Sequence, residues 1–334
     1  MAKKTILTGV KSSGHPHLGN YVGAIKPAIE LSNNPEHQGL LFIADYHSLT
    51  TVHDKKTLQD STLEVAATWL ACGLDPSKTV IFRQSDIPEL FELTWVLSCF
   101  TGKGLLNRAH AYKAMVQKNE EEGRDVDAGV SMGLYNYPVL MAADILMFGT
   151  DLVPVGKDQV QHLEMAADIA GSFNAVYGPI LKIPGAYVNE QTATIPGLDG
   201  RKMSKSYDNV IPLFGDPKKL RKLVMRIVTD STPPEEPKDP AASHISQLYS
   251  ALATPEQSEA LAERYRKGIG WGEAKQALFE ALETSLAEPR KIYDDLRAHP
   301  EVIEKHLAEG REKARAVSLP LMQKIREAIG IGRS

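Results

Sequence analysis

An apolar run that ends in a glycine-rich turn opens this chain and limits the folds open to it. Residues 5–10 read Thr-Ile-Leu-Thr-Gly-Val, which predicts a short buried strand. Residues 11–16 are turn-forming, and apolar residues with helical spacing begin at Leu18. Strand, turn and helix in this order are typical of the first βα unit of a nucleotide-binding fold, where the helix N-terminus faces an anion. The segment alone is equally compatible with an ordinary βα turn.

A second segment, Lys-Met-Ser-Lys-Ser at residues 202–206, complements the first turn. It follows a loop with two glycines, which can move. In the first turn, His17 can donate to a phosphate oxygen, and Gly19 permits a base or ribose to approach the backbone. Lys202 and Lys205 of the second segment carry mobile ammonium groups. Such groups would stabilise the negative charge that adenylyl transfer builds on the phosphates in the transition state. We therefore interpret the two segments as a two-part clamp for the triphosphate of ATP, in preference to a solvated basic loop.

Strand-like and helix-like runs alternate as far as about residue 215. The strand-like runs include residues 39–44, 79–82 and 152–155. Helix-like runs lie between and after them, for example residues 57–72 and 159–171. Because strands that alternate with helices build parallel sheets, we predict an α/β fold with a doubly wound, Rossmann-type parallel sheet.

The C-terminal part of the sequence has a different pattern. Four prolines fall within residues 230–240, which predicts a loop, and almost everything after it is helical. Thr254 and Pro255 begin one helix with a capping residue and a proline at its first position. We predict a Rossmann-type catalytic domain over residues 1–215, with the ATP and amino-acid sites, and a smaller all-helical domain over residues 216–334.

Composition excludes several classes of protein. The chain has 334 residues, of which 43% are hydrophobic, enough for a large core, and its formal net charge of −4 means that any nucleic acid must meet a local basic patch. The two cysteines, Cys72 and Cys99, predict neither a disulfide framework nor a zinc site, so we expect a cytoplasmic protein. No secretory signal or membrane-spanning run is present in the sequence given.

One acidic residue stands out in an apolar segment. Asp144 is the only charged residue between Leu134 and Thr150. If Pro138 lies in the first turn of a helix, Met141, Asp144 and Ile145 share one face. A carboxylate on an apolar surface is costly unless a donor meets it. From the residues alone, pairing with an internal arginine or a backbone N–H is the favoured interpretation.

Several ordered motifs together resemble the class I aminoacyl-tRNA synthetases and, more narrowly, the bacterial tryptophanyl-tRNA synthetase family. The similarity extends over nearly the whole chain, and its motifs are residues 9–24, 137–146, 153–159, 202–209, 228–231 and 268–275. The resemblance implies activation of L-tryptophan by ATP, brought as its Mg²⁺ complex, followed by transfer of tryptophan to tRNA(Trp). It also implies a symmetric homodimer, for which the apolar segment 95–100 could supply an interface, and an anticodon-binding helical domain. No protein-bound metal or prosthetic group is expected.

The resemblance assigns phosphate chemistry to both clamp segments. The expected catalytic residues are His17, Asn20, Lys202 and Lys205. The expected ATP-binding residues are Lys11, Ser12, Ser13, Gly19, Asn20, Lys113, Gly156, Lys157, Asp158, Ile195, Lys202, Met203, Ser204, Lys205 and Ser206. For Lys113, a surface position without a role is nearly as compatible with the sequence.

The resemblance also assigns an amino-acid site. Asp144 is expected to accept the indole N–H of tryptophan, which would exclude phenylalanine. Tyr137 and Gln159 match positions that bind the substrate ammonium group. The remaining expected residues line the indole pocket: His47, Met141, Val153 and Val155.

Two departures from the family pattern leave roles open. Lys11-Ser12-Ser13 replaces a common Gln-Pro-Ser, so Lys11 could bind the substrate carboxylate or a phosphate, and Lys157 replaces a usual glutamate. Two other functions stay under consideration. One is a tyrosine-specific relative, since the two enzymes share their architecture, and the other is an inactive paralogue that binds RNA.

Overall fold

The computed structural model describes residues 3–12, 14–155, 160–188 and 195–332. Its strands form one parallel five-stranded sheet in the order β3-β2-β1-β4-β5. The strands are β1 (Lys4–Lys11), β2 (His37–Ala44), β3 (Val80–Arg83), β4 (Leu152–Val155) and β5 (Gly185–Val188). The predicted doubly wound α/β fold is confirmed. β1 pairs with β2 along its whole length and with β4 on its other side, so the first strand is central.

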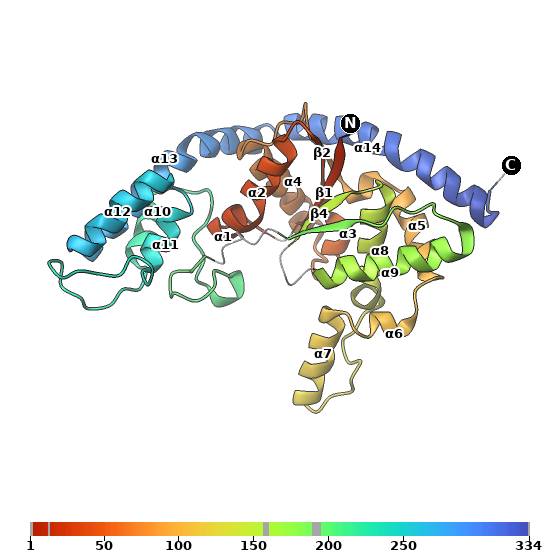
Figure 1. The fold of residues 1–334 in the computed structure, drawn as a ribbon, viewed down its shortest axis with the longest axis horizontal. Coiled ribbons are helices and arrows are strands. Elements are labelled where there is room, and N and C mark those ends of the chain that lie inside the picture. The colour runs from red at the N-terminus through yellow and green to blue at the C-terminus, as the bar shows by residue number, and fades with distance from the viewer. Residues whose placement is uncertain (1–2, 13, 156–159, 189–194, 333–334) are drawn as a thin grey trace.

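Helices connect the strands. The predicted first helix runs as α1 (Leu18–Asn20), a π-helical turn η1 (Tyr21–Ile25) and α2 (Lys26–Asn33). The other helices of the sheet-forming part are α3 (Asp45–Ser48), α4 (Lys55–Ala71), η2 (Gln84–Asp86), α5 (Glu89–Ser98), α6 (Lys103–Leu106), α7 (His110–Glu121), α8 (Met132–Met147) and α9 (Val160–Tyr177). Helix α7 projects away from the sheet (Figure 1).

The C-terminal part is helical, as predicted. After the short η4 (Lys205–Tyr207) come α10 (Pro217–Met225), α11 (His244–Ser250), α12 (Pro255–Lys267), α13 (Trp271–Ala298) and α14 (Pro300–Ile329). Thr254 caps α12 by accepting from the backbone N–H of Gln257, and Pro255 is its first residue, which confirms the predicted helix start. No helix among the described residues is long and apolar enough to cross a membrane.

One local prediction is wrong. Pro138 does not lie in the first turn of its helix, because α8 begins at Met132 and contains Pro138 in its interior. Ser131 caps this earlier start by accepting from the backbone N–H of Leu134. The proline removes one backbone donor from the helix interior, and α8 continues past it because its apolar residues are buried against α5 and α9.

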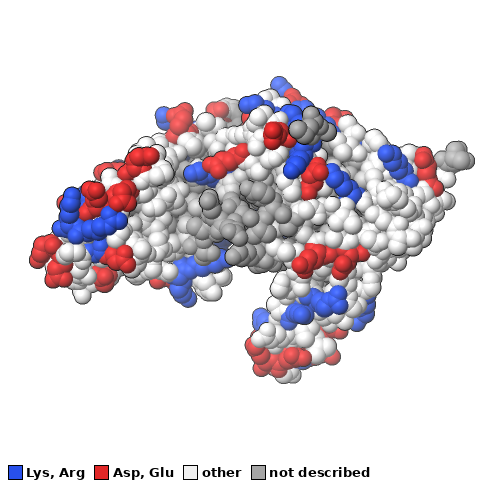
Figure 2. Space-filling view, viewed as in Figure 1, with Lys and Arg blue, Asp and Glu red and all other residues white. Residues whose placement is uncertain are grey.

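Two apolar layers cover the sheet. Leu41 and Ile43 of β2 face one layer, and Leu40 and Phe42 face the other, because successive side chains of a strand point to opposite faces. The first layer continues into α10–α13, so the helical part shares a core with one face of the sheet. Lys, Arg, Asp and Glu side chains intermingle on the visible surface (Figure 2), in keeping with the small net charge.

Helix α14 runs back along the sheet (Figure 1) and packs against its edge strand β3. Its Ile303 and Leu307 belong to one apolar layer, and its Ala314, Met322 and Ile325 belong to the other. Ion pairs tie the same helix to the body: Arg315 contacts Glu89 of α5 at 2.6 Å, Arg326 contacts Glu92, and Glu304 contacts Arg83. The last helix therefore packs with the sheet, although the sequence places it in the helical domain; the boundary at residue 215 stays a prediction.

The contact between α14 and β3 predicts a sharp stability difference between two glycines. A Cβ added at Gly310 would lie 1.6 Å from the carbonyl oxygen of Ile81, whereas one added at Gly171, inside α9, would meet nothing within 4 Å. We expect Gly310→Ala to lower the free energy of unfolding by about 1–3 kcal/mol or more, because the helix must move off the strand. Gly171→Ala should raise it by about 0.5–1 kcal/mol. Urea unfolding measures both, and equal stability of Gly310→Ala and the wild type would contradict the contact.

Candidate functional site

Backbone hydrogen bonds join the first turn to the chain that follows the Lys-Met-Ser-Lys-Ser segment. The Leu18 N–H donates to the Ile211 carbonyl at 2.8 Å, and the Leu213 N–H donates to the Pro16 carbonyl at 3.2 Å. His17 and Pro212 form an isolated antiparallel bridge between these bonds. The two predicted phosphate-binding segments therefore lie side by side.

Side chains complete the junction. The Gly19 N–H lies 3.3 Å from Sδ of Met203, and a Cβ at Gly19 would lie 2.9 Å from Nδ1 of His17 and 3.4 Å from Met203. The side chains of His17 and Met203 therefore fill the space that a side chain at position 19 would need. A Cβ at Gly14 would be 3.3 Å from Nζ of Lys205, so the clamp lysine lies against the first turn.

His17 is held in one orientation and one charge state. Its Nδ1 accepts from the backbone N–H of Asn20 at 3.3 Å, and Oδ1 of Asn20 accepts from the backbone N–H of His17 at 3.1 Å. Burial, and then the positive charge of Lys205, lower the pKa of His17 to about 4. The ring is therefore neutral at pH 7, and since Nδ1 accepts, its proton lies on Nε2. That N–H is the donor that the sequence predicted for a phosphate.

Asn209 organises the clamp segment. Its Oδ1 accepts from the Ser204 N–H at 2.8 Å, and its Nδ2 donates to the carbonyl of Lys202 at 3.1 Å and to Oδ1 of Asp199 at 2.7 Å. The two hydroxyls of Ser204 and Ser206 are 2.8 Å apart. Together these bonds shape the turn that presents the lysines. Ile195 lies under this turn, where its carbonyl accepts from the Met203 N–H at 3.1 Å.

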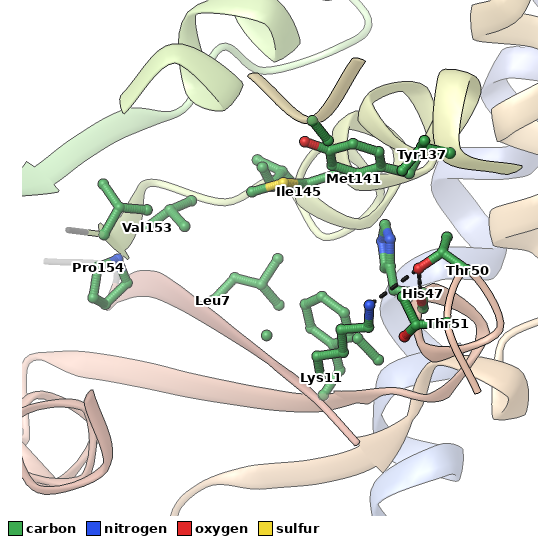
Figure 3. A pocket seen from close by; sticks show the side chains of 16 residues that line it. Leu7, Lys11, His47, Thr50, Thr51, Tyr137, Met141, Ile145, Val153 and Pro154 are labelled. Atoms are coloured by element: carbon green, nitrogen blue, oxygen red, sulfur yellow. Dashed lines mark hydrogen bonds between the residues drawn. The ribbon is translucent and has the colours of Figure 1, made fainter. Parts of the chain in front are cut away.

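A largely apolar cavity of about 480 Å³ opens beside the carboxyl ends of β1, β2 and β4 (Figure 3). Predicted pocket residues that line it are His47, Tyr137, Met141, Val153 and Val155. Unpredicted lining residues include Leu7, Phe42, Thr50, Thr51, Leu134 and Ile145. Met141 and Ile145 of α8 face Leu7 of β1 across the space, as expected at the carboxyl end of a parallel sheet (Figure 3).

Asp144 lies behind this cavity with two polar partners. Its side chain is 1% exposed; Oδ2 is 2.9 Å from Nε2 of His47, and both oxygens accept from Nε2 of Gln84 at 2.8 and 2.9 Å. Burial raises the pKa of Asp144, and the His47 and Gln84 contacts oppose that rise. Among the described residues, its partners are thus the side chains of His47 and Gln84, and the favoured expectation of an arginine or a backbone N–H is wrong. His47 lines the cavity and contacts Asp144.

Two of the residues that line the cavity, Lys11 and Tyr137, carry polar groups that are hydrogen-bonded. Nζ of Lys11 donates to Oγ1 of Thr50 at 3.0 Å, and burial of part of the side chain lowers the pKa of Lys11 (Figure 3). Oη of Tyr137 is 2.6 Å from Nε2 of His162. Both groups could orient a polar end of a ligand whose apolar part fills the cavity.

The structure places the remaining predicted residues in different surroundings. Ser12 is fully buried, and its hydroxyl is 2.8 Å from that of Ser48. Lys113 is exposed on α7, two residues after the cavity-lining Ala111. Five predicted residues lie outside the described part of the chain: Ser13, Gly156, Lys157, Asp158 and Gln159.

Sequence reasoning did not identify Gln84 or Asn209. Gln84 immediately follows β3, and residues at the carboxyl ends of parallel strands face the ligand edge of such a sheet. That signal could have found Gln84. Asn209 ends a segment that the resemblance already contained, but its bonds within the turn depend on the folded loop.

Comparisons with known proteins agree with this geometry. The family described as tRNA synthetases class I (W and Y) matches residues 2–287. Tryptophan--tRNA ligase of Pseudomonas putida is 55% identical over 329 residues, 98% of this chain and 73% of that protein. Tryptophan--tRNA ligase of Neisseria meningitidis is 51% identical over 332 residues, 99% of each chain. The crystal structure of tryptophanyl-tRNA synthetase from Campylobacter jejuni, complexed with ADP and tryptophan, has a TM-score of 0.88 and 43% identity, covering 98% of this chain and 100% of that one.

The lowered pKa of His17 predicts a loss of stability in acid that depends on this side chain. The unfolded chain takes up the proton near pH 6.5 and the folded chain only near pH 4. The stability that the neutral ring contributes is present above pH 6.5 and lost as pH falls toward 4, by about 3 kcal/mol in total. We expect urea unfolding to show a smaller acid loss for His17→Asn, which cannot take up a proton, than for the wild type. Equal losses would contradict the buried neutral ring; His53→Asn, at an exposed histidine, should behave as the wild type.

Proposed function

This chain belongs to the family of class I tRNA synthetases (W and Y), and we infer its function from that membership. It is an ATP-dependent ligase that attaches tryptophan to tRNA. One observation carries this conclusion. Over nearly the full chain, more than half of the residues are identical to those of proteins named tryptophan--tRNA ligase. That identity favours tryptophan over tyrosine as the substrate within a family that contains both.

The reaction has two steps. In the first, the tryptophan carboxylate attacks the α-phosphate of ATP, a new P–O bond forms, and the bond to pyrophosphate breaks. In the second, a terminal ribose hydroxyl of tRNA(Trp) attacks the carbonyl carbon of tryptophanyl-adenylate, and AMP leaves. No group of the enzyme needs to become covalently attached, so its work is positioning and stabilisation of charge.

For the first step, we propose that the clamp residues bind the phosphates of ATP, which enters as its Mg²⁺ complex. His17 offers Nε2–H as a neutral donor, Asn20 fixes that ring, and the ammonium groups of Lys202 and Lys205 neutralise the charge that develops on pyrophosphate. The contact between Lys205 and the first turn supports this role, because it brings the second lysine to the histidine. The roles of Lys113 and of Gly156, Lys157 and Asp158 stay predictions.

We propose that the apolar cavity takes the indole ring of tryptophan. Asp144 already holds a donor, His47, on Oδ2. If the His47 ring turns aside, the indole N–H can take its place on Oδ2. The carboxylate then exchanges one donor for another, while Gln84 keeps it in position. Lys11 and Tyr137 lie where the substrate's carboxylate and ammonium groups could be oriented. A phenylalanine ring has no donor and would leave the buried carboxylate with one bond fewer.

Exchange of labelled pyrophosphate into ATP tests these assignments without tRNA. The wild type should catalyse exchange with tryptophan and not with tyrosine. Lys205→Ala should lower kcat by about 10²-fold or more with little change in the KM for tryptophan. Asp144→Ala should raise the KM for tryptophan roughly 10- to 100-fold, with Lys267→Ala, at an exposed lysine of α12, as the unaffected control.

Each outcome bears on a different assignment. No tryptophan-dependent exchange by the folded wild type would refute the activity and leave the RNA-binding alternative. Normal kinetics of Lys205→Ala or of Asp144→Ala would remove the role of that residue alone.

We further propose that the chain forms a homodimer through the exposed side of α5. Trp95 of α5 is 73% exposed, and Leu319 of α14 is 41% exposed. The two helices that carry these side chains pack together, because Arg315 and Arg326 of α14 pair with Glu89 and Glu92 of α5. Exposed large apolar side chains that gather in this way are typical of a protein interface.

Sedimentation equilibrium tests the dimer. The wild type should sediment as a dimer, and Trp95→Glu should shift it toward the monomer, because a charge would be buried in the apolar contact. Ile292→Glu, at an apolar residue exposed on α13, is the matched control and should leave the mass unchanged. A monomeric wild type, or a dimer that Trp95→Glu does not weaken, would contradict the proposed interface.

The cellular location and the anticodon-binding role of residues 216–334 stay predictions. Cys72 and Cys99 are both free thiols in the structure, which suits a reducing compartment. Burial raises the pKa of Cys72 to about 12, so that thiol stays protonated and unreactive.

A further inference from the structure

A buried carboxylate lies where three separate segments meet. The Glu64 side chain, on α4, is 5% exposed. Oη of Tyr293 donates to its Oε2 at 2.5 Å, and Nε of Arg297 is 3.7 Å from the same oxygen. Nδ1 of His15 is 3.0 Å from Oε1. The carboxylate therefore joins α4 to two residues of α13 and to the turn between β1 and α1.

His15 is an exposed side chain with an unusual restraint. Its side chain is 81% exposed, yet one ring nitrogen contacts a carboxylate that is almost completely buried. An exposed histidine without a restraint would sample several rotamers. Because Nδ1 is directed at Glu64, Nε2 at the far side of the ring is directed away from it. The pair therefore holds a ring with one nitrogen open to a ligand.

The position of His15 identifies the ligand. Gly14, its neighbour, lies against Nζ of Lys205, and His17, two residues on, is close enough to Lys205 for that charge to lower its pKa. The negative charge of Glu64 also acts on Lys205, where it opposes the lowering of the pKa by burial. His15, His17 and Lys205 therefore lie close to one another, around Gly14 and Glu64. In the proposed function the triphosphate of ATP binds to His17 and Lys205, so His15 lies next to it.

Contacts with α13 keep the carboxylate in place. The ring of Tyr293 stacks on Phe214 at 4.6 Å between centroids, and Phe214 directly follows the backbone bridge that joins the two clamp segments. The turn, the bridge and α13 are therefore one connected unit around Glu64. A carboxylate fixed in this way can fix the ring that contacts it.

We propose that His15 is an additional ligand for the β- and γ-phosphates of ATP, and that Glu64 is the residue that positions it. With Nδ1 held at 3.0 Å from Oε1 of Glu64, the other ring nitrogen, Nε2, can meet a phosphate oxygen. His15 lies outside the residues expected to act on ATP, and its role rests on the proposed function. Glu64 acts through His15 and does not touch the substrate.

Equilibrium binding of ATP and of AMP to the full chain tests the proposal. AMP has the adenosine and the α-phosphate but lacks the groups that His15 would bind. We expect His15→Ala to weaken ATP binding about tenfold and to leave AMP binding unchanged, since one charge-assisted bond is lost. Glu64→Gln should weaken ATP binding in the same direction by a smaller factor, and Tyr293→Phe by less again, because each loosens the ring without removing it.

Two control variants separate positioning from general damage. Glu89→Gln removes the charge of another buried glutamate, which is 6% exposed and paired with Arg315 of α14. It should cost stability as Glu64→Gln does but leave ATP affinity intact. His53→Ala, at an exposed histidine bonded to the Leu49 carbonyl, should change neither affinity.

The possible results are distinct. Unchanged ATP binding by His15→Ala, or equal weakening of ATP and AMP, would overturn the role of His15. Weakening by Glu64→Gln that Glu89→Gln reproduces would overturn the positioning role of Glu64. Failure of the wild type in pyrophosphate exchange would refute the proposed function, and ATP and AMP binding would still report on His15.

Discussion

Backbone hydrogen bonds between residues 16–18 and residues 211–213 are the constraint on which the rest of the site depends. Backbone groups must be paired when they leave water, so this short bridge fixes the first turn against the chain that follows the clamp segment. Once it forms, Met203 closes over Gly19 and Lys205 lies against Gly14. The same proximity explains why His17 stays neutral: its ring is buried beside an ammonium group. The arrangement of the two segments and the neutral state of His17 therefore depend on one contact between parts of the chain that are far apart in sequence.

The parallel sheet supplies the second half of the site. Because all its strands run in one direction, their carboxyl ends meet at one edge. Lys11 ends β1 and Val155 ends β4, whereas Gln84 directly follows β3 and His47 lies in α3, which follows β2. The apolar side chains there form the cavity, and the polar ones lie at its border. Asp144 is buried behind this layer, and its carboxylate is tolerated because Gln84 and His47 donate to it. A site of this kind can exchange one donor for another without leaving a buried charge unpaired.

The C-terminal helices do more than follow the catalytic part. Helix α14 packs against the edge strand β3, where Gly310 allows helix and strand to touch, and α13 brings Tyr293 and Arg297 to Glu64. These contacts make the helical region a structural neighbour of the turn between β1 and α1. The parts of the chain before and after residue 215 therefore share apolar layers.

Local patterns in the sequence determined much of this protein. Strands β1 to β4, the start of α12 and the motifs that resemble a family follow from residues within a few positions of one another, since propensities, caps and turns act over short distances. Even so, the helix that contains Pro138 began earlier than predicted, because Ser131 caps it and tertiary packing maintains it. The tertiary structure alone decided the partners of the buried polar groups. Asp144 pairs with His47 across 97 positions, and Glu64 pairs with Tyr293 across 229. Pairs so distant in sequence are selected by which elements pack together, and no local pattern encodes that choice.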